Sequence, residues 1–366
     1  MIKVLIRYAE IGLKGGNRRF FEDQLIKNIK INLDNPKLQV IKAQKQFLIS
    51  AEKLNLDKLK TVFGIAWYAS VIESEITTAS IAKAALSLAE KNKTFAVRGH
   101  HNLEMEIGDI VRIKKKINVD LSNPEQTIYI TQFNQKVLIF NQKLPGPGGL
   151  PVGTSGRVLC LLSGGFDSIA AAYLLSKRGA RIDFLHFHVF PHSDQVLKSK
   201  IKIIIDKLFP WTLSSHLYLA SYTPFQMEVL DLHPNLVNQE LIVFRRLMVK
   251  VGEQLALKNH YQALLLGDSL GQVASQTMEN IVAVDQAVNI PIFRPLIGMD
   301  KKDIINLVAQ IGLEEVTNLP YKDCCSIVAT HPSTKANLDK IAIIEKQIKI
   351  EIIVKKIIQD VPFITL

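Results

Sequence analysis

Cysteine is scarce in this sequence: 366 residues contain three, and two of these, Cys324 and Cys325, are adjacent. Such a set cannot form a disulfide framework, and the absence of a C-x-x-C pair argues against structural zinc. We therefore expect a protein of the reducing cytoplasm. Long apolar runs are also missing, so no membrane span is expected although 48% of the residues are hydrophobic. The N-terminus alternates as a strand does, which predicts no signal peptide.

Two common phosphate-binding motifs, G-x-x-x-x-G-K-[ST] and G-x-G-x-x-G, do not occur. A different glycine turn is present, Ser163-Gly164-Gly165-Phe166-Asp167-Ser168. It follows a continuous apolar run at 158–162, typical of a strand buried in a parallel sheet, and precedes an Ala/Leu-rich helix at 169–177. With a second strand at 181–189, the segment is a βαβ unit. Its turn and helix N-terminus can bind phosphate through backbone N–H groups.

The side chains of this turn indicate pyrophosphate chemistry. Ser163 and Ser168 supply hydroxyls, and the glycines allow close backbone approach. The carboxylate of Asp167 would be repelled by bound phosphates unless Mg²⁺ lay between them, so Asp167 is the candidate metal-bridging residue. The alternative is an ordinary strand–turn–helix in which Asp167 or Ser168 caps the helix. The whole string resembles the PP-loop of the ATP pyrophosphatases, which cleave ATP between the α and β phosphates.

Positive charge predominates, with 45 Lys and Arg against 34 Asp and Glu, a net charge of +11. Such an excess favours a polyanionic partner, although a solvated basic surface is the alternative. One cationic group lies in a glycine-rich turn near the N-terminus. Another lies around a predicted strand and helix and includes His100 and His101. The lysines at the C-terminus of that helix could simply complement the helix dipole, but the dipole does not explain Arg98 on the strand. The candidate RNA-binding residues of the two groups are Lys14, Arg18, Arg19, Arg98, Arg112, Lys114, Lys115 and Lys116.

Strand and helix patterns divide the chain into several domains of α/β and α+β type. Residues 1–60 have a small ferredoxin-like α+β pattern, and residues 61–145 form a second α+β unit. Residues 146–156 are rich in proline and glycine and are expected to be a linker. Residues 157–366 repeat strand and helix signals, which predicts a doubly wound parallel sheet.

A specific family resemblance rests on several motifs along the chain: SGGFDS, RYAEIGLKGGNRRFFE, FRRLM, LLLGDSLGQVASQT, FRPLIGMDKKDI and Cys-Cys-x₅-His-Pro. Together they resemble the ThiI family, tRNA 4-thiouridine synthetases, over essentially the full length; Ala9 stands where the family usually has glycine. The resemblance implies a ferredoxin-like domain, a THUMP RNA-binding domain and a PP-loop domain of the adenine nucleotide alpha hydrolase type. The implied reaction is ATP-dependent thiolation of uridine 8 in tRNA.

The C-terminal rhodanese domain of some family members does not occur in this sequence. We therefore expect sulfur to come directly from a cysteine desulfurase or another carrier, and a role in thiamine thiazole synthesis is in doubt. Family habit also implies a homodimer.

The chemistry of the residues agrees with this reaction. Adenylation turns the uracil C4 oxygen into a leaving group, and a cysteine persulfide is a suitable sulfur nucleophile. Cys324 and Cys325 are the candidates, with Cys325 favoured; Cys160 lies within the predicted buried strand and should be inert. Structural thiols and, less well supported, an iron–sulfur cluster are the alternatives for the adjacent pair.

The candidate ATP-binding residues combine the turn with positions implied by the resemblance. The alternative to a ligand role for His186 is a buried strand histidine. Lys301 matches a family lysine linked to catalysis, and the alternative is a surface residue at the start of a helix. The ATP-binding candidates are Leu161, Leu162, Ser163, Gly164, Gly165, Asp167, Ser168, His186, Phe187, Arg245, Gly267 and Gln276; the catalytic candidates are Asp167, Lys301, Cys324 and Cys325.

Two rival functions are consistent with parts of the pattern. Another PP-loop transferase, either a 2-thiolating tRNA enzyme or an amidotransferase-type synthetase, would usually bring C-x-x-C ligands or a glutaminase domain, and neither is found. An RNA-binding protein with a degenerate PP-loop is the rival from another class, and the intact S-G-G-x-D-S string argues against it.

Overall fold

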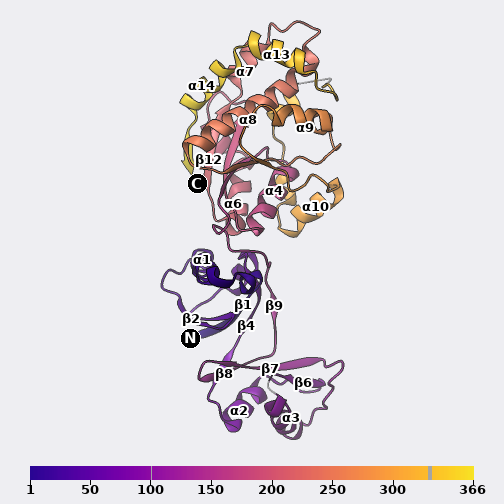
Figure 1. The fold of residues 1–366 in the computed structure, drawn as a ribbon. Helices are drawn as coiled ribbons and strands as arrows, with labels where there is room; N and C mark the ends of the chain where they lie inside the picture. Colours follow the sequence, from indigo (N-terminus) through magenta and orange to yellow (C-terminus); the bar gives the residue numbers. More distant parts are fainter. Residues whose placement is uncertain (100, 329–331) are drawn as a thin grey trace. The chain divides into compact units, whose positions relative to one another are not determined.

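The computed structural model describes residues 1–99, 101–328 and 332–366, without the side chains at 101, 102, 325 and 326. His100 and His331, named in the sequence motifs, lie outside the described residues, as does the side chain of His101. The chain divides into two compact units, Met1–Pro151 and Val152–Leu366, which are described separately (Figure 1). The division falls inside the proline- and glycine-rich segment 146–156.

The first sheet of the N-terminal unit has five strands in the order β2-β3-β1-β4-β9. One face packs against α1 (Arg18–Asn32), where Leu25 and Ile29 meet Val4 and Ile6 of β1 in a fully buried cluster. The apolar positions of α1 recur at helical spacing, which explains why this face of the helix is buried. The strands are β1 (Ile2–Tyr8), β2 (Gln39–Ala43), β3 (Gln46–Ala51), β4 (Ile65–Ser70) and β9 (Leu144–Pro145).

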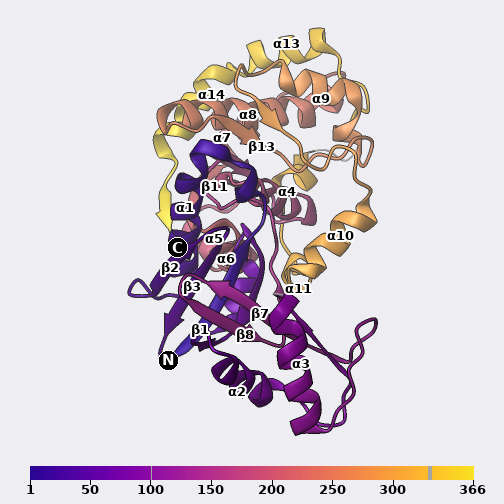
Figure 2. The same ribbon diagram turned by 60° about the horizontal axis from the view of Figure 1, so that its bottom comes forward.

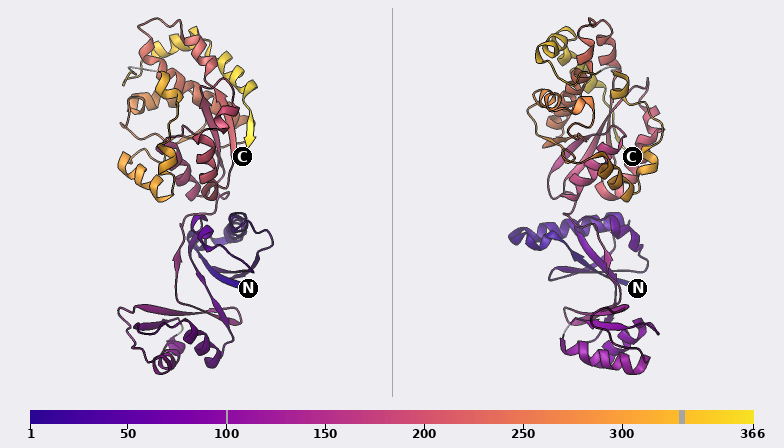
Figure 3. Two further views of the ribbon diagram at one scale, coloured as in Figure 1. Left: turned by 180° about the vertical axis from the view of Figure 1, so that it is seen from behind. Right: turned by 90° about the vertical axis from the view of Figure 1, so that its right-hand side faces the viewer.

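The second sheet of this unit has four strands in the order β5-β8-β7-β6. The helices α2 (Thr78–Leu88) and α3 (His101–Lys115) pack side by side on the same face of it (Figures 2 and 3). Ile128 and Ile130 face the helices, whereas Phe133 and Phe140 form a small cluster with Leu5 of the first sheet. The strands are β5 (Ile72–Ser74), β6 (Phe95–Arg98), β7 (Gln126–Phe133) and β8 (Lys136–Phe140).

Strand pairing differs from the expected boundary at residue 60. β4 pairs with β1 from Val4↔Ser70 to Tyr8↔Ile65, and β9 pairs with β4. Two strands of the first sheet therefore come from beyond residue 60. The expected boundary did not include them, because local periodicity in the sequence does not show which distant strands pair. Next to this boundary lies a short 3₁₀ helix, Leu56–Thr61, whose start is capped by the side chain of Asn55.

The C-terminal unit is built on a six-stranded sheet in the order β14-β13-β10-β11-β12-β15. Its strands run parallel except for β15, which pairs antiparallel with β12, so the expected doubly wound parallel sheet is confirmed. The strands are β10 (Arg157–Leu161), β11 (Arg181–His188), β12 (His216–Ser221), β13 (Ala263–Leu265), β14 (Ile292–Phe293) and β15 (Phe363–Thr365).

Helices cover both faces of this sheet. Cys160 and Phe184 point to the face covered by α4 (Phe166–Lys177), α6 (Lys200–Thr212) and α10 (Lys301–Gln310). Leu159 and Leu185 point to the opposite face, covered by α8 (Glu240–Lys258), with α13 (Leu338–Gln347) and α14 (Ile350–Asp360) beside it (Figure 1). Short helices complete the layers: α5 (Asp194–Leu197), α7 (Thr223–Val229), α9 (Met278–Asp285), α11 (Glu314–Thr317) and α12 (Cys324–Val328).

The strands of this sheet are apolar on both faces because both faces are covered, which explains why their sequences read as continuous apolar runs. Among the described residues, no helix is long and apolar enough to cross a membrane.

A buried carboxylate holds the amino ends of these strands. Asp183 in β11 is fully buried and accepts hydrogen bonds from Arg157 at 3.1 Å, from Tyr261 at 2.9 Å and from Ser214. Burial alone would raise the pKa of Asp183, but these bonds and the nearby His216 lower it below the ordinary value.

Replacement of this carboxylate should destabilise the C-terminal unit. We expect Asp183→Ala to lower the free energy of unfolding by about 3 kcal/mol at pH 7, because buried donors lose a charged acceptor. Since the folded-state pKa lies below 3.8, the contribution of Asp183 is complete above that pH and disappears as the pH falls through the lowered pKa. Urea unfolding measures both effects. Asp206→Asn, at an exposed pair with Lys202, is the control and should change stability by less than about 0.5 kcal/mol.

Candidate active site

The glycine turn between β10 and α4 is tied together by its own serines. The amide of Ser163 donates to the Ser168 hydroxyl at 3.3 Å, and that hydroxyl donates to the Gly165 carbonyl at 3.2 Å. Gly164 has φ +84°, a left-handed conformation that favours glycine, and a Cβ there would lie 2.8 Å from the terminal methyl group of Ile201 in α6. The turn is therefore preorganised, with the N-terminus of α4 at its end.

The helix cap distinguishes two interpretations of the turn. The N-cap of α4 is Gly165, and among the described residues no side chain caps it. The interpretation of Asp167 or Ser168 as the helix cap is therefore wrong. The first N–H groups of α4 have no carbonyl partner within the helix, as at every helix start, and together with the helix dipole they favour an anion.

Asp167 is the centre of a small charged cluster. Its carboxylate accepts from the Lys301 ammonium at 2.8 and 3.0 Å and from the Gln272 amide at 3.0 Å. Lys301 begins α10, 134 positions after Asp167 in the sequence, so the fold brings both catalytic candidates together. Lys301 is also a surface residue at the start of a helix, as the alternative holds, and its ammonium lies on a carboxylate of the turn.

The donor atoms around Asp167 fit a magnesium ion shared with a nucleotide. Within the described ranges, no group of three or more His, Cys, Asp or Glu side chains could hold a metal by itself. Mg²⁺ commonly needs only one or two carboxylates when phosphate oxygens supply other ligands. The Gln272 carbonyl oxygen is buried with no hydrogen-bond partner in the described structure, and it is a second hard oxygen beside Asp167. Asp167 would have to exchange its contact with Lys301 for the ion.

Gly267 follows β13 and lies directly against this turn. A Cβ on Gly267 would be 2.5 Å from the carbonyl carbon of Asp167 and 2.7 Å from the amide nitrogen of Ser168. These are backbone atoms and cannot move aside as a flexible side chain could. The absence of a side chain at 267 therefore allows the loop after β13 to contact the turn.

A chain of ion pairs lines the same region. Asp268, 4% exposed, accepts from Arg245 of α8 at 2.6 Å and from Arg294 at 2.9 Å, and Arg294 also pairs with Asp285. Burial alone would raise the pKa of Asp268, but the two guanidinium groups lower it below its ordinary value. Asp268 therefore stays ionised and fixes the orientation of Arg245.

These elements enclose a pocket of about 200 Å³ at the carboxyl ends of β10 and β13, where ligand sites of doubly wound sheets occur. Several candidate ATP-binding residues line it: Leu161, Ser163, Asp167, Ser168, Arg245, Gly267 and Gln276. The residues that line it without having been singled out as ATP contacts are Met248, Leu266, Asp268, Val273, Ser275 and Asp323. Asp268 and Arg294 could have been found from their positions just after strands β13 and β14.

Three other ATP-binding candidates have buried side chains. Leu162 packs in the core beneath α4 and α6, and Phe187 packs on the opposite face against Phe244 at a ring distance of 5.9 Å. The ring of His186 is 1% exposed, and both its nitrogens have protein partners, Leu162 and Tyr321. His186 is thus a buried strand histidine, the alternative raised from the sequence.

The cysteines have different surroundings. Cys160 lies in β10 with no exposure, and burial raises the pKa of its thiol. Cys324 starts α12 and is 1% exposed within the core on the α8 face, directly after the pocket residue Asp323. The side chain of Cys325 lies outside the described structure. Residues 321–325, here called the cysteine segment, therefore adjoin the pocket.

The cationic candidates lie in the N-terminal unit. Arg18 donates to the Gly12 carbonyl at 3.2 Å, and Arg19, 92% exposed, is 3.9 Å from Asp23. Lys14 lies over the Phe21 ring at 5.0 Å. In the second group Arg112 pairs with Asp109 at 3.0 Å, and Arg98 donates to the Leu121 carbonyl in the loop after α3. Lys114 and Lys116 are exposed at the end of α3, and Lys115 is half-buried.

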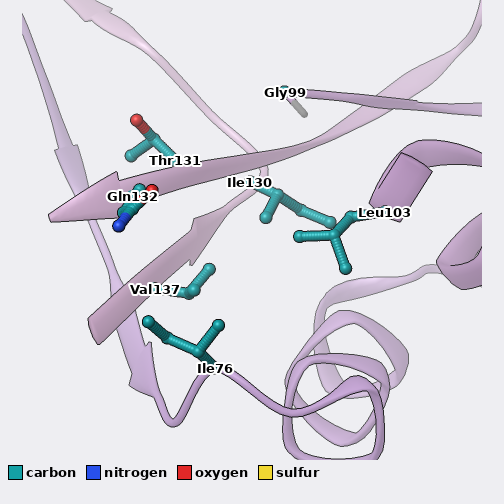
Figure 4. A pocket seen from close by; sticks show the side chains of 7 residues that line it. All are labelled: Ile76, Gly99, Leu103, Ile130, Thr131, Gln132 and Val137. Carbon is teal, nitrogen blue, oxygen red and sulfur yellow. The ribbon is translucent and has the colours of Figure 1, made fainter. Parts of the chain in front are cut away.

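A second cavity lies in the four-stranded sheet of the N-terminal unit, with a volume of about 430 Å³. Ile76 of the loop before α2, Leu103 of α3, and Ile130 and Val137 of the strands β7 and β8 converge on it (Figure 4). A Cβ on Gly99, which also lines it, would lie 1.9 Å from the Ile130 carbonyl oxygen, so glycine is required where the strand β6 ends. The cavity is predominantly apolar and has no cluster of catalytic side chains among the described residues.

Enlarging Gly267 tests whether this close approach shapes the pocket. Gly267→Ala should weaken Mg–ATP binding by about 5- to 160-fold, because displacing a packed backbone costs about 1–3 kcal/mol. Titration calorimetry measures the affinity. Gly298→Ala is the matched control, since a Cβ there meets nothing within 4 Å, and it should leave the affinity unchanged. Equal affinity in both variants would contradict the role given to Gly267.

Comparisons with known proteins place this fold and site in a family. The model described as "Thiamine biosynthesis protein (ThiI)" matches residues 153–350, and the ThiI ferredoxin-like domain model matches residues 3–69. A "Probable tRNA sulfurtransferase" of Caldanaerobacter subterraneus subsp. tengcongensis is 36% identical over 92% of this chain and 93% of its own length. Another of that name, from Alkaliphilus oremlandii, is 35% identical over 96% and 95%.

Solved structures agree. A 4-thiouridine synthetase, solved in complex with RNA and with bound ATP, superposes with a TM-score of 0.90 at 29% identity and covers 100% of both chains. PH1313 from Pyrococcus horikoshii shares the fold, with a TM-score of 0.65 at 20% identity over 86% of this chain and 100% of its own. The chain therefore belongs to the ThiI family.

Proposed function

We propose that this protein is an ATP-dependent tRNA sulfurtransferase that forms 4-thiouridine at position 8 of tRNA. The relatives that match along nearly the whole chain carry the name tRNA sulfurtransferase, and the solved relative is a 4-thiouridine synthetase with RNA and ATP. The observation that carries the proposal is the pocket lining: Ser163 and Asp167 of the PP-loop and Asp323 of the cysteine segment line the same pocket. An activating nucleotide and a sulfur-carrying residue can thus meet in one place.

The first step is adenylation. The uracil C4 oxygen attacks the α-phosphorus of ATP, the bond to the β-phosphate oxygen breaks, and pyrophosphate leaves. The N–H groups of the PP-loop and the N-terminus of α4 hold the pyrophosphate, and Lys301 and Arg245 supply positive charge close to it. Mg²⁺ held by Asp167, with Gln272 beside it, would neutralise charge on the phosphate oxygens.

The second step transfers sulfur. The terminal sulfur of a Cys325 persulfide attacks C4, and AMP leaves with the former carbonyl oxygen. A second thiol then attacks the Cys325 sulfur and forms a disulfide with it, as the bond between Cys325 and the transferred sulfur breaks and 4-thiouridine leaves. Cys324 is less suited to carry the persulfide, because its 1% exposure in an apolar cluster disfavours a thiolate and access by a sulfur donor. We propose a cysteine desulfurase as that donor.

The N-terminal unit supplies the RNA-binding surface in this proposal. Its exposed cations around α1 and at the end of α3 can contact phosphates, which positions a tRNA without reading its sequence. The domains proposed are the ferredoxin-like sheet and the four-stranded THUMP sheet, and the enzyme acts as a homodimer in the cytoplasm.

Thiolation of unmodified tRNA with ATP, Mg²⁺ and a desulfurase tests the proposal. We expect Asp167→Ala to abolish both tRNA-dependent pyrophosphate release and 4-thiouridine formation. Cys325→Ser should keep pyrophosphate release and lose thiolation, and Cys160→Ala, which removes the fully buried thiol that is not a candidate sulfur carrier, is the control that should keep both. Wild-type protein that binds tRNA but never releases pyrophosphate would favour an RNA-binding function instead. Activity of both Cys324→Ser and Cys325→Ser would refute the persulfide role.

The cations at the end of α3 predict a salt dependence. Replacing Lys114, Lys115 and Lys116 by glutamine should weaken tRNA binding and lower the slope of log affinity against log salt concentration by about 2 to 3, because each phosphate contact contributes about 0.7–0.9. Filter binding between 50 and 200 mM salt, a range of about fourfold, measures the slope. The charge-matched control replaces Lys346, Lys355 and Lys356, exposed on α13 and α14, and should leave the slope unchanged. An equal loss in both variants would contradict a specific basic surface.

A further inference from the structure

The side chain of Tyr321, three residues before Cys324, hydrogen-bonds a residue of β11, the strand beside the one that leads into the PP-loop. Its hydroxyl lies 2.6 Å from Nε2 of His186 in β11. Nδ1 of the same ring lies 2.6 Å from the carbonyl oxygen of Leu162, the residue directly before the PP-loop serine Ser163. The cysteine segment is thus joined through one histidine to the end of the strand that carries the PP-loop.

The direction of these hydrogen bonds follows from their chemistry. A backbone carbonyl only accepts, so Nδ1 of His186 carries the proton and donates to Leu162. Nε2 then has a lone pair and accepts from the Tyr321 hydroxyl. The ring is 1% exposed, and burial lowers the pKa of His186 to about 4, so it stays neutral and keeps this tautomer at physiological pH.

Other contacts hold the same segment in place. Phe190, which follows β11, packs edge-on against the Tyr321 ring at 5.9 Å, and the Lys200 ammonium lies 5.9 Å from that ring. Lys200 also donates to the Thr317 carbonyl at 2.8 Å, at the end of α11. Two residues beyond Tyr321, Asp323 lines the ATP pocket. These contacts hold Tyr321 in place, and the chain that follows it lines the pocket at Asp323.

We propose that Tyr321 is a positioning residue for sulfur transfer: its hydroxyl on His186 holds the cysteine segment beside the activated uridine. The inference rests on the proposed function, since it assumes that a cysteine of this segment carries the sulfur. Adenylation uses the PP-loop, Lys301 and Arg245, which do not depend on Tyr321 for their contacts. Loss of the hydroxyl should thus separate the two steps of the reaction.

The variant Tyr321→Phe keeps the ring and removes only the hydroxyl. Pyrophosphate release with tRNA should stay within about twofold of wild type, whereas single-turnover sulfur transfer from persulfide-loaded enzyme should fall by about 10- to 100-fold, the loss expected for a misplaced reacting group. Tyr261→Phe is the matched control, because it removes a buried tyrosine hydroxyl that hydrogen-bonds Asp183 at the amino ends of the strands. It should leave both rates unchanged.

Alkylation of Cys324 provides a readout that needs no activity. Because Cys324 is 1% exposed, iodoacetamide labelling followed by mass spectrometry should be slow in wild type and in Tyr261→Phe, and several-fold faster in Tyr321→Phe. Faster labelling with ATP affinity unchanged would support the part of the inference that the Tyr321 hydroxyl holds the cysteine segment, whereas failure of the wild-type enzyme to thiolate tRNA would refute the proposed function separately. Wild-type labelling and wild-type sulfur transfer in Tyr321→Phe would overturn the inference while leaving the proposed function intact. An equal fall in pyrophosphate release and sulfur transfer would also overturn it, since the hydroxyl would then serve the whole site.

Discussion

The close backbone contact between the PP-loop and the segment after β13 is the constraint on which the site depends. Parallel strands end at one edge of the sheet, so the turn after β10 and Gly267 after β13 meet there. Since the contact joins backbone to backbone, it leaves no room for a side chain. Asp268 directly follows Gly267, and Arg245 and Gln276 hydrogen-bond Asp268 and line the same pocket.

Charge compensation explains why the pocket can hold ionised groups before a nucleotide binds. Asp268 is buried between two guanidinium groups, and Asp167 is paired with Lys301. Burying unpaired charges would be unfavourable, so each carboxylate has a cationic partner from a distant part of the chain. The two pairs differ in exposure: Asp268 is almost fully buried, whereas Lys301 is 44% exposed and can change partner. The buried ion pair therefore fixes the side chains in the wall of the pocket, whereas Lys301 of the exposed pair can move to another anionic partner.

The parts of the structure that could be predicted are those that depend on local sequence patterns. The apolar runs and the glycine turn identified β10, α4 and β11, because a strand, a turn and a helix have distinct residue preferences over a few positions. Long-range pairing had no such signal: β4 and β9 join the first sheet from beyond the expected boundary. The sequence also did not determine the environment of His186, because the side chain of a strand histidine can face a ligand or the core. Its contacts with Leu162 and Tyr321 show that it is a buried residue.

By itself, the sequence determined that the chain contains a PP-loop on a parallel sheet, an excess of positive charge and an adjacent pair of cysteines, because motif and composition are local properties. Tertiary structure alone decided that Lys301 lies on Asp167, that Gly267 packs against the PP-loop and that Asp323 lines the pocket. The first two contacts join residues more than 90 positions apart. Their geometry depends on how the strands are ordered and how helices pack on them, and no local pattern specifies that order.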